Sequence, residues 1–370
     1  MEGGRNYDSL PGDITRRIFS LLPLYLVLRL RLVCKAWYAL ITEFAAEYLN
    51  RSKETSLGII CGNSRCISSG VFSLDISSLQ IRGGIKTLMT KTLSISPRFA
   101  FNGSINGLIC LDDAKNNIHV FNPTTGEFVT LPPAHLSSYI IGIGYCPLTK
   151  QYKAVKIFQD FIEFATPVKA AAVITVGAPS NSWRFIESSP PYRCIGPNVY
   201  LNGTLFWLSC TLSWWLSYTE ETMPLAITAF DVSDETFRII RLPPKVLSRN
   251  LNCLAEQEGR LCLVKFDAEK EYFEIYIMLE DFQWISQYRV SIKDFEPHCA
   301  NNYFSSFQFL CLKKGKITLW SKLMQRWIFY DIKSRAIETI QVGDANEKMI
   351  ASSDLLICPY EESLTPICNC

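Results

Sequence analysis

The sequence predicts a multidomain α+β chain in which three short helices precede a much larger all-β domain. Between Leu10 and Leu49, apolar residues recur at the spacing of a helix. From Leu57 onward, short runs rich in Val, Ile, Phe, Tyr and Trp alternate with clusters of Gly, Asn, Asp and Pro, which is typical of strands and turns. We therefore expect a flexible N-terminus at 1–8, a helical domain at 9–49, a polar linker at 50–56 and a β domain at 57–370.

The first helix is expected between two prolines. Pro11 can open it, because an N–H group in the first turn has no partner to lose, whereas Pro23 must end or kink it. One apolar stripe of this helix consists of Ile14, Ile18, Leu21 and Leu22. Two further helical runs follow at 24–33 and 35–49. A segment this small buries only about 60% of its unfolded surface, so its surplus apolar surface is predicted to pack on the rest of the chain or on another protein.

These residues resemble an F-box in the form common among plant proteins. The matching motifs are Leu10-Pro11-x-Asp13-Ile14, Ile18-Phe19-x-x-Leu22-Pro23 and Leu30-Arg31-x-Val33-Cys34-Lys35-x-Trp37. The chain departs from the usual pattern at Leu26, Leu30 and Leu32, which make the second helix more apolar. The resemblance implies that this region docks on a Skp-type adaptor. The residues that match the family's adaptor-binding and core positions, which the sequence does not distinguish, are Leu10, Pro11, Ile14, Ile18, Leu22, Pro23, Leu30, Val33 and Trp37.

The β region repeats with a period near fifty residues, which indicates a stack of similar units. Each clear unit contains a strand, a turn and a second strand, as at 118–133, 227–244 and 327–340, with less regular copies at 172–186 and 273–290 and a degenerate first copy at 72–79. A turn glycine and a further strand precede most units, at Gly203, Gly259 and Gly315 among others. About four strands per unit make a propeller blade. Six blades are favoured and seven remain open, with the ring closed by pairing 354–358 beside 57–61.

This region also resembles the F-box-associated and kelch-type β domains that follow plant F-boxes. The most specific matches are the line from Phe121 to Pro133 and the strand from Tyr152 to Ile157. The kelch signature, a Gly-Gly pair in each blade, is represented only by Gly83-Gly84. A paired-sheet form of the F-box-associated fold is the alternative architecture.

Charge and hydropathy exclude several classes of protein. The net charge is +2 with scattered Lys and Arg, so we expect no nucleic-acid partner. There is no apolar run of membrane-spanning length and no apolar signal core, so we expect no membrane partner and a location in the nucleus, the cytoplasm or both. The 14 cysteines lack C-x-x-C spacing and the 3 histidines lie far apart, so we expect reduced, mostly buried thiols, no metal and no cofactor.

The sequence contains no recognisable catalytic motif. Gly142-Ile-Gly144 lacks the third glycine of a dinucleotide-binding loop, and neither a nucleophile elbow nor a P-loop occurs. The carboxylate pair Asp112-Asp113 is expected in a solvated turn, and Asp231 and Asp331 are expected to cap turns. The glycosylation-like sequences at Asn102-Gly103 and Asn202-Gly203 are interpreted as Asn-Gly turns. Because no catalytic motif is found, we expect that the protein is not an enzyme.

One aromatic stretch between two predicted strands is a candidate substrate-binding loop. It contains Trp214, Trp215 and Tyr218, and consecutive tryptophans cannot face the same side of a strand. Trp and Tyr dominate the energetics of protein interfaces, so one of these side chains is a candidate anchor. Packing between blades is the alternative.

Two functions remain. The resemblance implies the substrate-recognition subunit of a Skp–cullin–F-box (SCF) E3 ubiquitin ligase. In that role the F-box binds the adaptor and, through it, cullin, while the β domain holds a target protein for ubiquitination without bond chemistry of its own. The alternative is a glycan- or small-ligand-binding propeller that acts outside a ligase. The sequence does not identify the substrate, because propeller loops vary without a rule.

Overall fold

The fold comes from a computed structural model, which describes 11–22, 24–43, 57–58, 65–66, 72–80, 84–93, 99–113, 116–133, 139–159, 169–178, 182–210, 226–243, 246, 252–267, 271–291, 307–313, 315–321, 326–341 and 363–367. For 57–93 the description covers backbone pairing only. The expected N-terminus, linker and closing strand at 354–358 lie outside these residues, as do Leu10, Pro23, Trp214, Trp215 and Tyr218.

The helical region consists of α1 (Gly12–Leu21), α2 (Leu24–Leu30) and α3 (Lys35–Glu43). The Pro11 carbonyl accepts hydrogen bonds from the backbone N–H groups of Ile14 and Thr15, each at 3.0 Å, so α1 begins where the sequence predicts. It ends at Leu22, whose backbone is extended (ψ 150°), as the residue before a proline prefers. No helix in the described part of the chain is long and apolar enough to cross a membrane.

A small core holds these helices together. Phe19, Val27 and Ile41, one from each helix, are almost fully buried. The Trp37 ring packs edge-on against Phe19, with 5.1 Å between ring centroids. An ion pair between Arg16 and Glu43 (2.6 Å) joins α1 to the end of α3.

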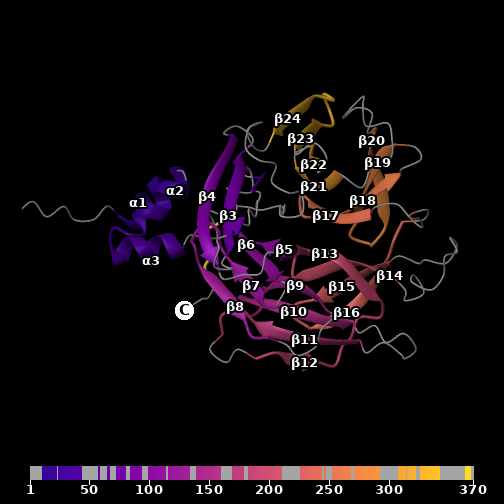
Figure 1. Cartoon of the computed structure of the whole chain (residues 1–370), viewed down its shortest axis with the longest axis horizontal. Coiled ribbons are helices and arrows are strands. Elements are labelled where there is room, and N and C mark those ends of the chain that lie inside the picture. The colour runs from indigo at the N-terminus through magenta and orange to yellow at the C-terminus, as the bar shows by residue number, and fades with distance from the viewer. Residues whose placement is uncertain are drawn as a thin grey trace, which may run out of the picture.

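Five of the sheets are four-stranded antiparallel meanders whose strands pair in chain order, and we number them blades 1 to 5 (Figure 1). Blade 1 contains β5 (Phe99–Ile105), β6 (Leu108–Asp113), β7 (Ile118–Phe121) and β8 (Phe128–Leu131). Blade 2 contains β9 (Tyr139–Cys146), β10 (Gln151–Gln159), β11 (Lys169–Thr175) and β12 (Arg184–Ile186). Blade 3 contains β13 (Arg193–Leu201), β14 (Thr204–Cys210), β15 (Ala226–Asp231) and β16 (Thr236–Arg241).

Blades 4 and 5 complete the regular set. Blade 4 contains β17 (Asn252–Gln257), β18 (Arg260–Asp267), β19 (Tyr272–Met278) and β20 (Trp284–Ser291). Blade 5 contains β21 (Phe307–Lys313), β22 (Lys316–Ser321), β23 (Arg326–Asp331) and β24 (Ile337–Gln341). The hairpins predicted at 118–133, 227–244 and 327–340 are therefore confirmed.

The first sheet of the β domain differs from a blade. It contains β1 (Leu57–Gly58), β2 (Arg65–Cys66), β3 (Phe72–Gln80) and β4 (Gly84–Leu93), and its order is β1-β3-β2, with β4 also paired to β3. The predicted hairpin at 72–79 is wrong, because those residues form one continuous strand that pairs with β4. The prediction of six equivalent blades is thus corrected to five regular blades and one sheet of different topology.

Glycines in β9 allow blades 2 and 3 to pack closely. A Cβ added at Gly142 would lie 2.4 Å from Cζ2 of Trp207 on β14, and one at Gly144 would lie 2.7 Å from Cγ2 of Val232. Trp207 is fully buried in the apolar cluster between these blades. The two glycines therefore leave room for side chains of blade 3. Close packing explains both glycines, and nucleotide binding is not needed to explain them.

Outer tryptophans link neighbouring blades. The indole N–H of Trp183, just before β12, donates to the carbonyl of Pro132 after β8, at 2.8 Å. In the same way the indole N–H of Trp284 on β20 donates to the Arg241 carbonyl on β16, at 2.9 Å. These two tryptophans thus hold blades 2 and 4 to the blades before them.

The two Asn-Gly sequences have different roles. Asn202 (φ 47°) and Gly203 (φ 84°) form the predicted tight turn between β13 and β14. Asn102 and Gly103 lie within β5, at a shift of register, so the second predicted turn is wrong. Here the Asn198 side chain bonds to the Asn102 carbonyl and fills the space beside Gly103.

Candidate functional site

The largest apolar side chains exposed on the helical region form two groups. On α1, Ile14, Ile18 and Leu21 are 49%, 41% and 70% exposed, and their spacing places them on one stripe. At the turn after α2 and on α3, Leu32, Val33 and Tyr38 are 86%, 61% and 50% exposed. We call these six residues the helical surface. So much exposed apolar area on so small a unit is typical of a protein-binding surface.

Local structure fixes this exposure. The Thr15 and Phe19 side chains occupy the buried side of α1, so residues one position before them face outward. The Arg31 guanidinium lies over the Tyr38 ring, 4.7 Å from its centroid, and holds that ring on the surface.

The structure separates contact from core positions among the residues expected to serve the adaptor. Four are exposed: Pro11, Ile14, Ile18 and Val33. Three pack against the helical core and are only partly buried: Leu22, Leu30 and Trp37. Their role in binding stays a prediction.

Three members of the helical surface were not among the residues expected from the sequence. Leu21 belongs to the α1 stripe, so its periodicity could have identified it. Leu32 stands where the motif departs from its usual pattern, and Tyr38 follows the last motif residue. Motif matching overlooks such positions, because it weighs similarity rather than exposure.

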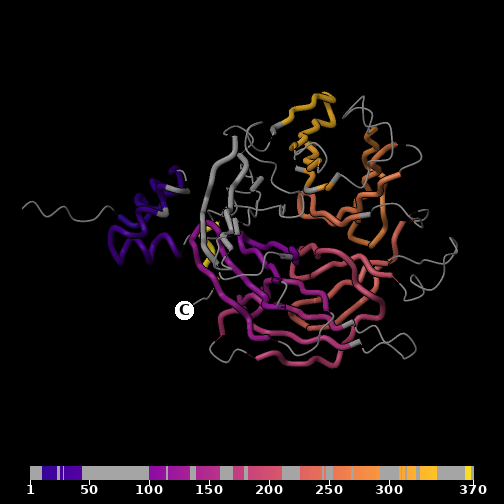
Figure 2. The backbone as a smooth tube through the Cα atoms, viewed as in Figure 1, coloured from indigo at the N-terminus to yellow at the C-terminus, as the bar shows by residue number. Residues whose placement is uncertain are grey.

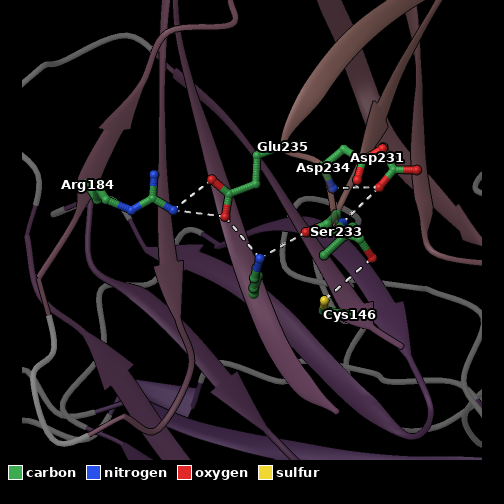
Figure 3. Close-up of polar contacts among 8 residues, drawn as sticks. Cys146, Arg184, Asp231, Ser233, Asp234 and Glu235 are labelled. Carbon is green, nitrogen blue, oxygen red and sulfur yellow. Dashed lines mark hydrogen bonds and ion pairs between the residues drawn. The ribbon is translucent and has the colours of Figure 1, made fainter. Parts of the chain in front are cut away.

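The β domain contains a charged cluster between blades 2 and 3 (Figure 3). The Glu235 carboxylate accepts hydrogen bonds from Lys153 Nζ at 2.9 Å and from Arg184 at 2.6 Å. Lys153 also donates to the Val232 carbonyl at 3.0 Å. Burial raises the pKa of Glu235, but its bonds to Arg184 and Lys153 outweigh burial and leave that pKa lowered. The cluster is satisfied internally and serves to join the blades.

Cys146 lies beside this cluster. Burial raises the pKa of its thiol, but hydrogen bonds with Thr149 and Ser233 and the charge of Lys153 lower it to about 7. The Sγ atom lies 3.5 Å from Ser233 Oγ. The residue is only 1% exposed, so the thiol has no access to a substrate. Eight cysteines have described side chains and are reduced thiols in the structure. Six of these eight are buried, as predicted for most of the thiols.

The expected solvated turn at Asp112-Asp113 is wrong. Strand β6 continues to Asp113, which is buried and accepts hydrogen bonds from the backbone and side chain of Asn117, both at 2.9 Å. His119 Nε2 lies 3.6 Å from the same carboxylate, and its Nδ1 lies 3.0 Å from Thr130 Oγ1. Burial lowers the pKa of His119. These groups stabilise the β6–β7 turn.

Within the described ranges, no group of side chains has the composition of a metal site.

Two family models match the chain. Residues 71–362 match the F-box associated beta propeller domain, and residues 7–45 match an F-box-like domain. The propeller match sets aside the paired-sheet alternative.

Similar proteins from Arabidopsis thaliana are named as F-box proteins. The F-box protein At3g07870 is 26% identical, over 71% of this chain and 67% of its own length. The F-box protein CPR1 is 24% identical, over 95% of this chain and 89% of its own length. A chain from a nidogen–laminin complex aligns with a TM-score of 0.43 at 11% identity, over 82% of this chain and 96% of that chain. The chain is a plant F-box protein and belongs to the family in which an F-box-like region precedes an F-box associated beta propeller domain.

Proposed function

We propose that this protein is the substrate-recognition subunit of an SCF E3 ubiquitin ligase. The observation that carries the proposal is the helical surface, which exposes Ile14, Ile18 and Leu21 on one stripe of the F-box-like region. Exposed apolar stripes of this kind bind partner helices or grooves through a few central anchors. The partner proposed is a Skp-type adaptor and, through it, cullin.

The propeller is proposed to hold the target protein. In a meander the first and third connections lie at one end of the blade and the second at the other. Tight turns such as Asn202-Gly203 and the Asp231 turn occupy the first end. The second connection of blade 3 leaves β14 at Cys210 and enters β15 at Ala226, at the other end. In the sequence this connection includes Trp214, Trp215 and Tyr218, which lie outside the described residues. We propose that end as the target side.

No catalytic step is assigned to the receptor. Its contribution is proximity: it raises the effective concentration of the target near the ubiquitin-conjugating enzyme. The buried environments of Cys146, Asp113 and His119 support a structural role for these groups.

The direct test is calorimetric titration of the full chain with a purified plant Skp-type adaptor. Wild type is expected to bind, and Ile14→Ala/Ile18→Ala is expected to lose about 2 kcal/mol or more, because both side chains are proposed anchors. Leu148→Ala is the control, because Leu148 is 79% exposed but lies between β9 and β10 of the propeller. Equal affinity of the double variant and wild type would contradict the proposed surface. No binding by wild type would favour a ligand-binding propeller that acts outside a ligase.

A further inference from the structure

A short segment near the C-terminus contacts both the helices and the propeller. This segment, 363–367, is called the C-terminal strap here, and it lies beyond the residues that match either family model. In Figure 2 it is the yellow piece between the indigo helices and the magenta strands of blade 1. Ser363, Leu364 and Ile367 are at most 3% exposed.

The strap completes the core of the helical region. Leu364 packs with Phe19, Val27 and Ile41 in one buried cluster, and it is the only member of that cluster, among described residues, from outside the helices. A domain separated from the propeller by a polar linker would be expected to close its own core. The helical core instead takes a side chain from the far end of the chain.

The other side of the strap is bonded to blade 1. The Asn122 side-chain amide donates to the carbonyls of Ser363 at 3.0 Å and Thr365 at 2.9 Å. The backbone N–H of Ile367 donates to Glu127 Oε2 at 2.7 Å, and the Ile367 side chain enters the apolar cluster between blades 1 and 2. Asn122 is fully buried, so these bonds are shielded from water.

Comparison with equivalent turns shows what is particular to Asn122. Its Oδ1 accepts from the backbone N–H of Thr124 at 2.9 Å, which caps the β7–β8 turn. Asp231 and Asp331 cap the matching turns of blades 3 and 5 through the same oxygen. A carboxylate therefore suffices for the turn, whereas the two bonds to the strap need the N–H donors of an amide.

We propose that the C-terminal strap fixes the orientation of the F-box helices on blade 1, with Asn122 and Leu364 as positioning residues. Leu364 anchors the helices and Asn122 anchors the strap, so the two units move as one body. If the protein acts as the proposed receptor, this coupling keeps a constant distance between adaptor and target for ubiquitin transfer. The coupling between the helices and blade 1 does not itself depend on the proposed function.

The test is a distance distribution between the helices and the propeller, measured by pulsed electron spin resonance on the full chain without adaptor. Spin-labelled noncanonical residues are placed at Arg17 and Leu148, both exposed. Wild type is expected to give one narrow distance. Asn122→Asp keeps the turn-capping oxygen but loses both N–H donors to the strap. Its distance distribution is expected to be broad instead of a single narrow peak.

Asp331→Asn is the matched control, because it makes the reverse exchange at a turn that bonds to no strap among the described residues. It is expected to leave the distance distribution unchanged. Glu127→Ala, at a partly exposed position, is a milder second variant that removes only the bond to Ile367 and should broaden the distribution less. Narrow, unchanged distances in both strap variants would overturn the proposal. If Asn122→Asp fails to fold, the Glu127→Ala result decides. Because no adaptor is present, this outcome is independent of whether the adaptor binds.

Discussion

At the residue scale, each polar side chain is used where its chemistry is needed. Asp caps turns that require only an acceptor, as at Asp231 and Asp331, whereas Asn122 stands where donors are needed too. The turn-capping role of the aspartates was predictable, because Asx turns depend on neighbouring backbone groups. The partners of Asn122 were not, because Ser363 and Thr365 lie more than two hundred positions away in the chain.

The Glu235 cluster gives a prediction of pH dependence. The lowered pKa of Glu235 means that its charge stabilises the folded state above the unfolded pKa, near 4.5, and that this contribution is lost as pH falls through the folded pKa. Glu235→Gln is expected to cost about 1–3 kcal/mol at pH 7, because Lys153 is left buried without a counter-charge. Urea unfolding at pH 7 and at pH 3 measures this.

The difference between Glu235→Gln and wild type should be smaller at pH 3 than at pH 7, because pH 3 lies below the unfolded pKa of the carboxyl. Glu187→Gln, at an exposed position, provides the control and should have little effect at either pH. An equal cost for Glu235→Gln at both values would show that its charge does not stabilise the blades.

At the scale of elements, patterns with local causes were predicted well. The strands at 118–121 and 128–131 coincide with β7 and β8, because an Asn-Pro-Thr-Thr-Gly turn separates two apolar runs. The hairpin at 72–79 failed because alternation alone does not distinguish one long strand from two short ones. The Gly83-Gly84 pair was the better signal in the sequence, since β4 begins at Gly84. The first unit of the β domain therefore looked like a blade in the sequence, but its strands pair in a different order.

Close packing of β9 against β14 yields a second prediction. Gly142→Ala places a Cβ against the buried Trp207 ring, and the resulting overpacking is expected to cost about 1–3 kcal/mol. Gly12→Ala is the control, because a Cβ there meets nothing within 4 Å. Thermal unfolding compares the two variants. A Gly142→Ala protein as stable as wild type would mean that blades 2 and 3 are less tightly packed than described.

At the scale of the whole molecule, two surfaces serve different partners in our account. The helical surface faces the proposed adaptor, and the propeller end that carries the β14–β15 connection faces the proposed target. The strap is bonded at the β7–β8 turn, which belongs to the opposite, tight-turn end of its blade. The sequence predicted both regions, but it did not predict their connection, because the contact of Leu364 with Phe19 has no local signal.

The most direct test of the central claim is hydrogen–deuterium exchange of the full chain with and without a plant Skp-type adaptor. We predict slower exchange on adaptor binding in α1 and in the turn from Arg31 to Cys34, with no change in blades 3 to 5. Protection confined to the propeller, with the helical surface exchanging as in the free chain, would contradict the account.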